Sequence, residues 1–559
     1  MVWALTSHFC NICSNAGSTR TSIFGNQPLD MTLSTWTQLL WSTLARPVPS
    51  GTCPGKPLYD LSHCAATHFH GVGNLLIAKA IFVKRNNPFF QPLREFLAMR
   101  SSVNEFKTRQ VSVNPAYQLK EVEFSLRKVG CKAIVCPTQF RTQKYCDMLT
   151  QICPEIESST PGDIRSARLP DLRSVITLGN RQPGMFHLED VMQAGSSQYM
   201  QQLQDLQKKL SCDDPINIQF TSGTTGAPKG ATLSHHSIIN NFILTQSHTH
   251  TPHIRVCLPV PLYHCFGSVG GGLCMALHGV SLVFPSAGYD GKANLAAMES
   301  ERCTVIYGTP TMYVDMVNHP DLAKHDLSSV ETGIMAGAPC PPELVKKVIY
   351  VMGIKEITIG YGTTENSPVT FFSSPTDNLE RKCETTGYII DHLEAKIVNP
   401  TTGEVVPLGM TGEIMIRGHC VMKGYWGDKD KTEECITKDR FYKTGDIGSM
   451  DAYSYLKIEG RIKDLIIRGG ENIYPAEIEQ FLHTHSKVKE AQVVGVEDSR
   501  LGEEICACIK LVDGEVCTAE EIKAYCKGQM AYFKIPHYII FMTSYPITTT
   551  GKVRAHIFL

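Results

Sequence analysis

Hydrophobic residues recur at helical spacing near residue 120. Leu119, Val122 and Leu126 lie three or four positions apart, which predicts a helix with one apolar face. Gly130 is expected to end this helix, because glycine readily adopts the conformation that terminates one. The apolar run 132–137 then predicts a short buried strand.

The same alternation of strand and helix continues through the middle of the chain. Leu344, Val348 and Val351 share one helical face. Strands separated by helices favour an α/β architecture in layers, with largely parallel sheets. Further strands are expected at residues 174–178, 216–220, 256–260, 281–284, 304–307 and 357–360.

The pattern becomes shorter after about residue 460. Pro475 is expected to open a helix that carries Ile478 and Leu482 on one face. Thr518 and Glu521 have the spacing of a capping box at the start of another helix. Strands are expected at residues 491–496 and 504–512. Together these elements predict a small α+β unit.

Three parts of the chain are therefore predicted. Residues 1–110 show little periodicity and form an atypical N-terminal segment, either a leader or an altered first lobe. Residues 111–462 are expected to form a large domain of several lobes, and residues 463–559 a small mobile domain.

Composition excludes several classes of protein. The net charge is −1, so the chain as a whole offers no electrostatic attraction to nucleic acid. No run of 18 apolar residues is present, which argues against a transmembrane segment. Of the first 50 residues only Asp30 is acidic. This weakly resembles a transit sequence, and an untargeted or poorly ordered leader fits about as well.

The cysteine pattern favours free thiols over a disulfide framework. The chain has 21 cysteines, and many stand singly in apolar strand-like runs. The one C-x-x-C pair, Cys10 and Cys13, lacks a second pair at regular spacing, so a zinc site is disfavoured.

The strongest chemical signal is a loop of glycine and hydroxyl residues directly after the strand predicted at 216–220. Glycines let the backbone approach an anion, hydroxyls donate to phosphate oxygens, and Lys229 adds a positive charge. Lys229 and Gly230 do not follow the Gly-Lys-Ser/Thr order of a Walker loop. The loop comprises Thr221, Ser222, Gly223, Thr224, Thr225, Gly226, Ala227, Pro228 and Lys229, and a helix is expected to open near Ser234.

This loop resembles the phosphate loop of the adenylate-forming enzymes, which include acyl-CoA synthetases, luciferases and peptide-synthetase adenylation domains. Further motifs of that family follow in order, over about residues 111–559. They are Pro261-Leu-Tyr-His264, Gly337-Ala-Pro339, Tyr361-Gly-Thr-Thr-Glu365, Gly412-Glu-Ile-Met-Ile-Arg-Gly418 with Gly424-Tyr-Trp426, Tyr442-Lys-Thr-Gly-Asp446, Gly460-Arg-Ile-Lys-Asp464 through Arg468 to Pro475, and Pro546-Ile-Thr-Thr-Thr-Gly-Lys552.

The resemblance implies a role for each matching residue. Glu365 would hold Mg²⁺, and Lys552 would act on the charge that builds at the carboxylate and α-phosphate. Thr364 and His264 join them as catalytic candidates, although His264 is about as well explained as a core histidine. Nucleotide or CoA contacts fall to the phosphate loop and to Gly337, Ala338, Tyr361, Gly362, Asp446, Arg461, Gly469 and Gly470.

The implied reaction is ATP-dependent activation of a fatty acid, of medium chain length, followed by transfer to CoA. ATP, Mg²⁺ and CoA would be required, in a mitochondrial or else a cytoplasmic setting. No carrier protein in cis is expected, because only seven residues follow Lys552. The alternative is a non-catalytic or unstable nucleotide-binding product, because the first-lobe motifs of the family are not found in residues 1–110.

Overall fold

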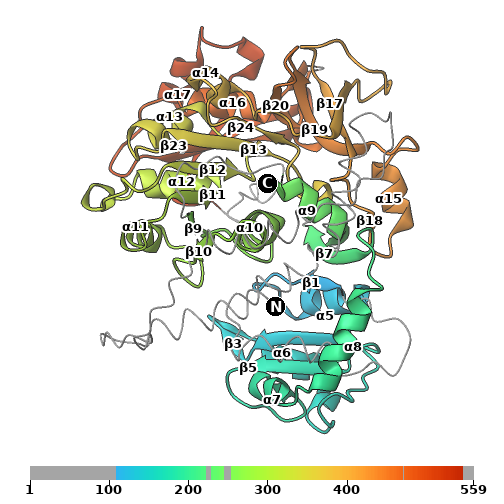
Figure 1. Cartoon of the computed structure of the whole chain (residues 1–559). Helices are drawn as coiled ribbons and strands as arrows, with labels where there is room; N and C mark the ends of the chain where they lie inside the picture. Colours follow the sequence, from blue (N-terminus) through green and yellow to red (C-terminus); the bar gives the residue numbers. More distant parts are fainter. Residues whose placement is uncertain (1–108, 222–227, 244–253, 470, 546–559) are drawn as a thin grey trace, which may run out of the picture.

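Layered α/β structure is present throughout the computed structural model, which describes residues 109–221, 228–243, 254–469 and 471–545 (Figure 1). The atypical segment 1–110, with Cys10 and Cys13, lies almost wholly outside the described residues. The expectations for that segment therefore stay predictions.

The first described lobe contains the helix expected near residue 120. This helix, α5 (Leu119–Lys128), buries Val122 and Leu126, and Gln118 and Glu121 form a capping box at its start. Gly130 follows its end with φ of +59°. The strand predicted at 174–178 is confirmed. The parallel sheet is β2 (Ala133–Pro137), β5 (Ser174–Leu178) and β6 (Phe186–His187), packed with α6 (Tyr145–Ile152).

A seven-stranded sheet forms the centre of the molecule. Its first five strands in spatial order are parallel, so their carboxyl ends lie along one edge. The order is β10 (Ser281–Val283), β9 (Arg255–Cys257), β11 (Val305–Gly308), β12 (Thr332–Ala336), β13 (Glu356–Tyr361), β14 (Phe371–Phe372) and β15 (Tyr388–Ile389).

Helices cover this sheet as the apolar periodicity predicts. Leu344 and Val348 of α13 are buried, and α13 packs with α11 and α12 over the strands (Figure 1). Val351, expected on the same face, instead lies just past the end of α13 and is 57% exposed. These helices are α11 (Gly291–Ser300), α12 (Pro310–Val317) and α13 (Pro342–Tyr350). The parallel α/β architecture is confirmed here, although β12 was not among the predicted strands.

The predicted phosphate loop joins two antiparallel strands. β7 (Pro215–Thr221) pairs with β8 (Lys229–Ser234), and α9 (His235–Ile243) begins directly after β8. The helix expected near Ser234 is therefore confirmed, but a strand precedes it. β1 (Gln110–Ser112) and β18 (Gly424–Tyr425) complete this sheet.

One sheet is antiparallel throughout, unlike the largely parallel arrangement that the sequence suggests. β16 is followed by β17, and β19 by β20, with no helix between them, which is the connectivity typical of antiparallel pairs, whereas the connection from β17 to β19 contains a helix. It contains β16 (Leu393–Val398), β17 (Gly412–Gly418), β19 (Tyr442–Met450) and β20 (Leu456–Arg461), with α15 (Lys429–Cys435) between β18 and β19.

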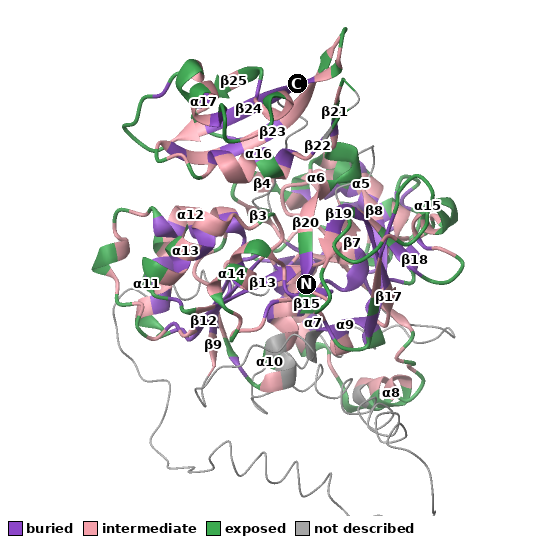
Figure 2. Ribbon diagram, turned by 90° about the horizontal axis from the view of Figure 1, so that it is seen from above, coloured by how far each residue is buried: buried purple, intermediate pink, exposed green. Residues whose placement is uncertain are grey.

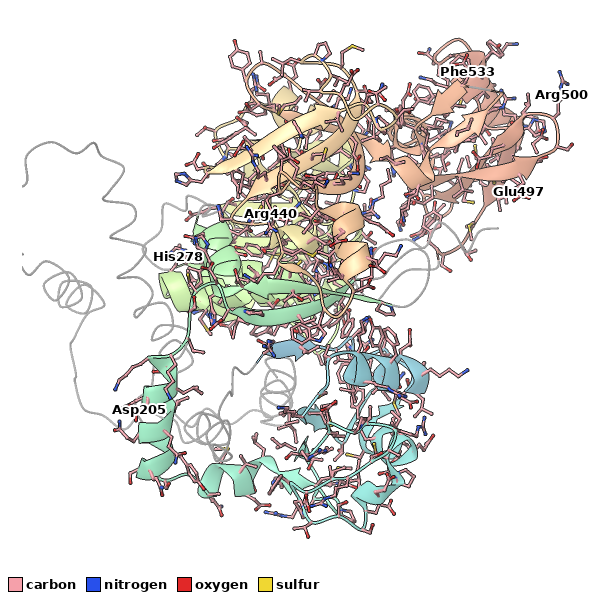
Figure 3. All side chains as sticks on the ribbon, turned by 90° about the vertical axis from the view of Figure 1, so that its right-hand side faces the viewer. Asp205, His278, Arg440, Glu497, Arg500 and Phe533 are labelled. Carbon is pink, nitrogen blue, oxygen red and sulfur yellow. The ribbon has the colours of Figure 1, made fainter. Side chains whose placement is uncertain are left out.

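The C-terminal residues form a separate α+β lobe (Figure 2). Figure 3 places Glu497, Arg500 and Phe533 on this lobe and Asp205 at the opposite end of the molecule. The capping box of Thr518 and Glu521 is confirmed, the strand predicted at 491–496 lies within a longer strand, and the strand predicted at 504–512 begins at 502 and ends at 511. The lobe comprises β21 (Ile466–Arg468), β22 (Glu471–Ile473), α16 (Pro475–Leu482), β23 (Val488–Asp498), β24 (Gly502–Leu511), α17 (Ala519–Cys526) and β25 (Tyr538–Phe541).

Apart from α8, which has 11 residues, the remaining elements are short. They are β3 (Gln139–Phe140), β4 (Gln143–Lys144), α7 (Leu188–Gln193), α8 (Ser197–Gln207), α10 (Leu273–His278), α14 (Leu379–Glu384), the π-helix η2 (Phe266–Gly272), and the 3₁₀ turns η1 (Pro154–Ile156), η3 (Leu322–Lys324), η4 (Thr364–Asn366), η5 (Ile462–Asp464) and η6 (Tyr532–Lys534). Among the described helices, none has the length and apolarity needed to cross a bilayer.

Candidate active site

Two glycines lie where neighbouring strands of the central sheet end. Gly337 directly follows β12, and Gly362 directly follows β13. Gly337 has φ of +90°, which favours glycine, and Ala338 comes next. A Cβ on Gly362 would lie 1.9 Å from the carbonyl oxygen of Pro368, so no side chain fits there. The carboxyl edge of a parallel sheet is where α/β proteins commonly bind ligands.

Asp446 lies at this edge and accepts from two other predicted site residues. The Tyr361 hydroxyl donates to Oδ2 at 2.7 Å, and Nε of Arg461 donates to Oδ1 at 3.0 Å. Asp446 and Arg461 are paired in register on β19 and β20, whereas Tyr361 comes from β13. The structure therefore brings together three side chains that the sequence assigned to the nucleotide.

Burial and charge shape this cluster. Asp446 is only 5% exposed. Burial raises the pKa of Tyr361 well above its usual range, and the neighbouring Asp446 raises it further. The same carboxylate raises the pKa of the Arg461 guanidinium. Asp446 thus accepts hydrogen bonds from the Tyr361 phenol on one oxygen and from the Arg461 guanidinium on the other.

Glu413 supports the turn that presents Asp446. Its Oε1 accepts from the backbone N–H of Gly445 at 3.2 Å, and burial raises the pKa of this carboxyl. Gly445 has φ of +71°. The backbone N–H of Asp446 donates to the Thr444 hydroxyl at 3.0 Å, which further fixes the turn.

Glu365 forms the second cluster. It lies in η4 and is 8% exposed. The Tyr425 hydroxyl donates to Oε1 of Glu365 at 2.8 Å, and the Glu365 carbonyl oxygen accepts from the N–H of Met422 at 2.7 Å. The Lys229 ammonium lies over the Tyr425 ring, 4.4 Å from its centroid. Lys229, the last residue of the phosphate loop, and Glu365, the predicted metal ligand, therefore both contact Tyr425.

The donor set around Glu365 fits a hard cation that keeps water and phosphate ligands. Among the described residues, no group of three or more His, Cys, Asp or Glu side chains is arranged to hold a metal ion. Mg²⁺ is commonly held by one or two carboxylates together with substrate phosphates, and Glu365 beside the phosphate loop offers such a carboxylate.

His264 has a visible structural role. Its Nδ1 accepts from the backbone N–H of Phe266 at 3.2 Å, at the start of η2. The adjacent Cys265 is buried, and its Sγ lies 3.6 Å from the Thr364 hydroxyl. Cys265, the neighbour of His264, therefore contacts Thr364, whereas Nδ1 of His264 accepts a hydrogen bond at the start of η2.

Several predicted site residues lie outside the described part of the chain. They are Ser222, Gly223, Thr224, Thr225, Gly226, Ala227, Gly470 and Lys552. The two ends of the phosphate loop are described: the Thr221 hydroxyl donates to the carbonyl oxygen of Lys229 at 3.4 Å, and Pro228 is half-buried. Gly469 has φ of +59°, and its N–H donates to the carbonyl oxygen of Leu501 at 2.8 Å.

Three residues that hold the site together were not predicted as such. Tyr425 and Glu413 belong to motifs that the sequence analysis quoted, but their contacts were not foreseen. Asn241 of α9 pairs with the backbone N–H and C=O of Val369, at 3.1 and 2.5 Å, and so fixes the segment after Glu365. Asn241 is 1% exposed. For Asn241 no signal is present in the sequence, because its burial is seen only in the structure.

Chemically, the two clusters present an acceptor for hydroxyl groups and an anionic ligand for a cation. A cationic lysine lies beside the loop that would receive phosphates. Such a site positions and neutralises a polyanionic substrate, which is the main requirement of reactions at phosphate.

Family models match two parts of the chain. The AMP-binding enzyme model matches residues 91–426, and the AMP-binding enzyme C-terminal domain model matches residues 477–552.

Curated proteins of similar sequence include the medium-chain acyl-CoA ligase ACSF2, mitochondrial, of Danio rerio. That relative is 68% identical over 449 residues, which cover 80% of this chain and 74% of the relative. The Homo sapiens protein of the same name is 54% identical over 450 residues, covering 79% and 73%. A putative acyl-CoA synthetase, YngI, of Bacillus subtilis is 43% identical and covers 83% and 85%.

Solved structures share the fold. The ATP-bound MatB of Rhodopseudomonas palustris superposes with a TM-score of 0.72 at 24% identity, over 86% of this chain and 97% of that one. The anthranilate CoA ligase AuaEII gives a TM-score of 0.69 at 24% identity, over 81% and 82%.

Proposed function

The chain belongs to the AMP-binding enzyme family, and from that premise we propose that it is an ATP-dependent ligase that converts a medium-chain fatty acid into its acyl-CoA. Its curated relatives carry that name, and the match covers about four-fifths of this chain. The non-catalytic alternative is not favoured, because the AMP-binding enzyme model matches residues 91–426 and several relatives of high identity are named as acyl-CoA ligases.

The reaction has two steps. A carboxylate oxygen of the fatty acid attacks the α-phosphorus of ATP, which forms an acyl-adenylate and releases pyrophosphate. The thiolate of CoA then attacks the acyl carbonyl carbon, which forms the thioester and releases AMP. ATP, Mg²⁺ and CoA are therefore the required small molecules.

The protein's part is to bind and orient the nucleotide. Asp446, held by Tyr361 and Arg461, accepts from the ribose hydroxyls. Glu365 is the carboxylate available to Mg²⁺, which when bound neutralises phosphate charge. Lys229 and the phosphate loop receive the triphosphate, and Lys552 serves the charge that develops during adenylate formation. The single observation that supports this assignment best is the convergence of Tyr361, Asp446 and Arg461 from three strands.

The decisive experiment measures the two steps separately on purified protein. Pyrophosphate release is followed with ATP, Mg²⁺ and a series of saturated fatty acids from short to long, and thioester formation is then followed after CoA is added. We expect acid-dependent pyrophosphate release with a maximum at medium chain length. Absence of acid-dependent release from a folded protein that binds ATP would contradict the proposed function.

Lys552→Ala tests the catalytic lysine within the same assay. Adenylate formation should fall by more than about tenfold, because the lysine is proposed to stabilise charge in the transition state, while ATP still binds. Lys527→Ala is the matched control, since Lys527 is an exposed lysine of the same lobe. Retention of adenylation in Lys552→Ala would contradict the role of Lys552.

The same relatives are named as mitochondrial, and we place this ligase in the mitochondrion on that basis. Fractionation of cells that express the full chain would test this, and recovery in the cytosol alone would contradict it.

A further inference from the structure

Tyr425 connects two groups on which the proposed function depends, yet no motif assigns it a task. It is the second residue of β18, which pairs with β8 so that Tyr425 lies opposite Ala231. This pairing places its ring directly beside the strand that carries Lys229. The side chain is 6% exposed, so its hydroxyl must find a partner inside the protein.

The partner of this hydroxyl is the Glu365 carboxylate. The O–H donates to Oε1 at 2.8 Å, across 60 positions of sequence. Among the described residues, no second donor to this carboxylate is found. A single hydrogen bond to Oε1 restrains the rotation of Glu365 and leaves Oε2 for another ligand.

The ring face has a different neighbour. The Lys229 ammonium lies 4.4 Å from the ring centroid, within the range of a cation–π contact. A cation over a phenol withdraws electron density from the ring, which strengthens the phenol as a hydrogen-bond donor. The cation–π contact with Lys229 therefore strengthens the hydrogen bond that Tyr425 donates to Glu365.

The backbone of Tyr425 is fixed as well. Its N–H donates to the Thr432 hydroxyl at 2.9 Å, and Thr432 in turn donates to the carbonyl oxygen of Asp428 at 2.7 Å. Gly424, with φ of +143°, has no room for a Cβ, which would lie 2.7 Å from a Thr432 carbon. Thr432 of α15 thus fixes the backbone of Tyr425.

We propose that Tyr425 is a positioning residue that orients the Glu365 carboxylate toward the magnesium of Mg·ATP and couples it to Lys229. This inference rests on the proposed function and extends it to a residue with no assigned role. Tyr425 touches neither nucleotide nor metal, and it acts through Glu365.

The first test is the affinity for ATP, measured by calorimetry with excess Mg²⁺ and again with a chelator. Tyr425→Phe keeps the ring and the cation–π contact and removes only the hydroxyl. We expect about tenfold weaker binding with Mg²⁺, equivalent to ~1.4 kcal/mol, and less than about twofold change without it. Unchanged binding in both conditions, or equal weakening in both, would overturn the proposal.

Tyr455 supplies a closely matched control. Its hydroxyl donates to Oδ1 of Asp377 at 2.7 Å, and the Arg381 guanidinium lies over its ring at 3.8 Å. Tyr455→Phe therefore removes the same kind of hydrogen bond beneath the same kind of cation, away from the candidate site. Its ATP affinity should equal that of the wild type with and without Mg²⁺.

A second measurement tests whether Tyr425 acts through Glu365. If it does, Glu365→Gln and the double variant Glu365→Gln/Tyr425→Phe should show equal magnesium dependence of ATP binding, because the hydroxyl has nothing left to orient. Additive losses would overturn the proposal. Binding needs no fatty acid, so its result is independent of acid-dependent pyrophosphate release, whose absence would instead contradict the proposed function.

Discussion

At the scale of single residues, the candidate site consists of buried polar groups whose partners come from distant elements. Asp446 is the clearest example, because both of its carboxylate oxygens already accept hydrogen bonds from Tyr361 and Arg461. Removal of the carboxylate would leave the half-buried Tyr361 hydroxyl without its acceptor, whereas the Arg461 side chain is 47% exposed and could turn to water. The cluster is therefore rigid before any nucleotide arrives, which favours binding because little further ordering is needed.

Asp446→Asn should weaken ATP binding by about tenfold to a hundredfold. The amide keeps the size of the side chain but loses the charge that strengthens acceptance from ribose hydroxyls, a loss of ~1.5–3 kcal/mol. Calorimetric titration with Mg·ATP measures this change. Unchanged affinity in a folded Asp446→Asn protein would be incompatible with the assigned role.

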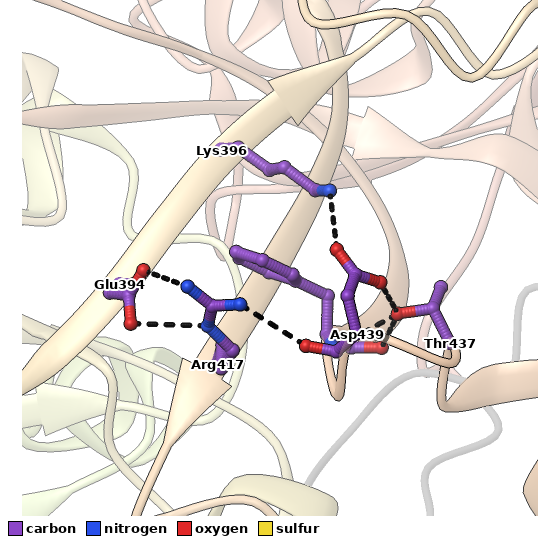
Figure 4. A network of polar contacts seen from close by, with 6 residues as sticks. Glu394, Lys396, Arg417, Thr437 and Asp439 are labelled. Carbon is purple, nitrogen blue, oxygen red and sulfur yellow. Dashed lines mark hydrogen bonds and ion pairs between the residues drawn. The ribbon is translucent and has the colours of Figure 1, made fainter.

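Asp439 offers the control for that variant. It accepts from Thr437 and pairs with Lys396 at 3.3 Å, while Arg417 donates to its carbonyl oxygen at 3.2 Å (Figure 4). This network is exposed, so Asp439→Asn should leave ATP affinity unchanged.

His419 should make the fold sensitive to acid. Burial and the neighbouring His236 and His392 lower its pKa to about 4, and its Nε2 is buried without a hydrogen-bond partner among the described residues. The pKa of His419 in the folded state lies below its value in the unfolded chain. The contribution of the neutral imidazole to the free energy of unfolding is therefore fully present above pH ~6.5. It is lost progressively as the pH falls from ~6.5 toward ~4.

His419→Gln should remove this part of the acid sensitivity. Between pH 7 and pH 5 the variant should lose about 2 kcal/mol less of its free energy of unfolding than the wild type. Urea unfolding at both pH values measures the difference. Parallel losses in the two proteins would show that His419 is not protonated on unfolding.

At the scale of elements, the π-helix η2 shows how glycines set local packing. A Cβ on Gly267 would lie 2.2 Å from the carbonyl oxygen of Pro261, and one on Gly271 would lie 2.4 Å from a Leu258 methyl. By contrast, a Cβ on Gly272 would meet only the Gly267 carbonyl oxygen, at 3.8 Å. Neighbouring atoms therefore leave no room for a Cβ at Gly267 and Gly271, whereas Gly272 has room for one.

Gly267→Ala and Gly272→Ala should consequently have opposite effects. The first forces backbone to move and should destabilise the protein by ~1–3 kcal/mol. The second adds a methyl in open space within a helix and should change stability by less than ~1 kcal/mol, in the stabilising direction. Urea unfolding of the pair measures both. Equal destabilisation by the two substitutions would contradict the packing described.

At the scale of the whole molecule, the short turn η5 joins the large part of the chain to the C-terminal lobe. Arg461 is tied to Asp446 just before this turn, and β21 of the C-terminal lobe begins just after it. Lys463 lies between these points, and burial lowers its pKa. The proposed reaction would use Lys552 for one step and the loop at Gly469 for the other, and both fall within the small C-terminal domain predicted at residues 463–559. We therefore propose that the lobe rotates about η5 between the two steps.

Lys463→Pro tests this rotation. Proline fixes φ and removes an N–H, so it should hold the turn in one arrangement. One half-reaction should survive while the other falls by at least about tenfold, which is ~1.4 kcal/mol of barrier. Single-turnover assays of pyrophosphate release and thioester formation separate the two. Equal loss of both steps would indicate destabilisation, and no loss would place the pivot elsewhere.

The sequence by itself determined the type of many elements and the order of the motifs. Residues 174–178 form the predicted strand, and the helix predicted from Leu119 begins at that residue, because apolar periodicity and glycine breakers act over a few positions. The family assignment is equally local, since each motif is a short run of neighbouring residues.

Only the tertiary structure decided which side chains meet. Tyr361 reaches Asp446 across 85 positions and Tyr425 reaches Glu365 across 60, through strand pairings that periodicity does not specify. The antiparallel sheet of β16, β17, β19 and β20 was missed for the same reason. Strand order and register depend on long-range contacts of the whole chain, whereas residue patterns report only the face that each element buries.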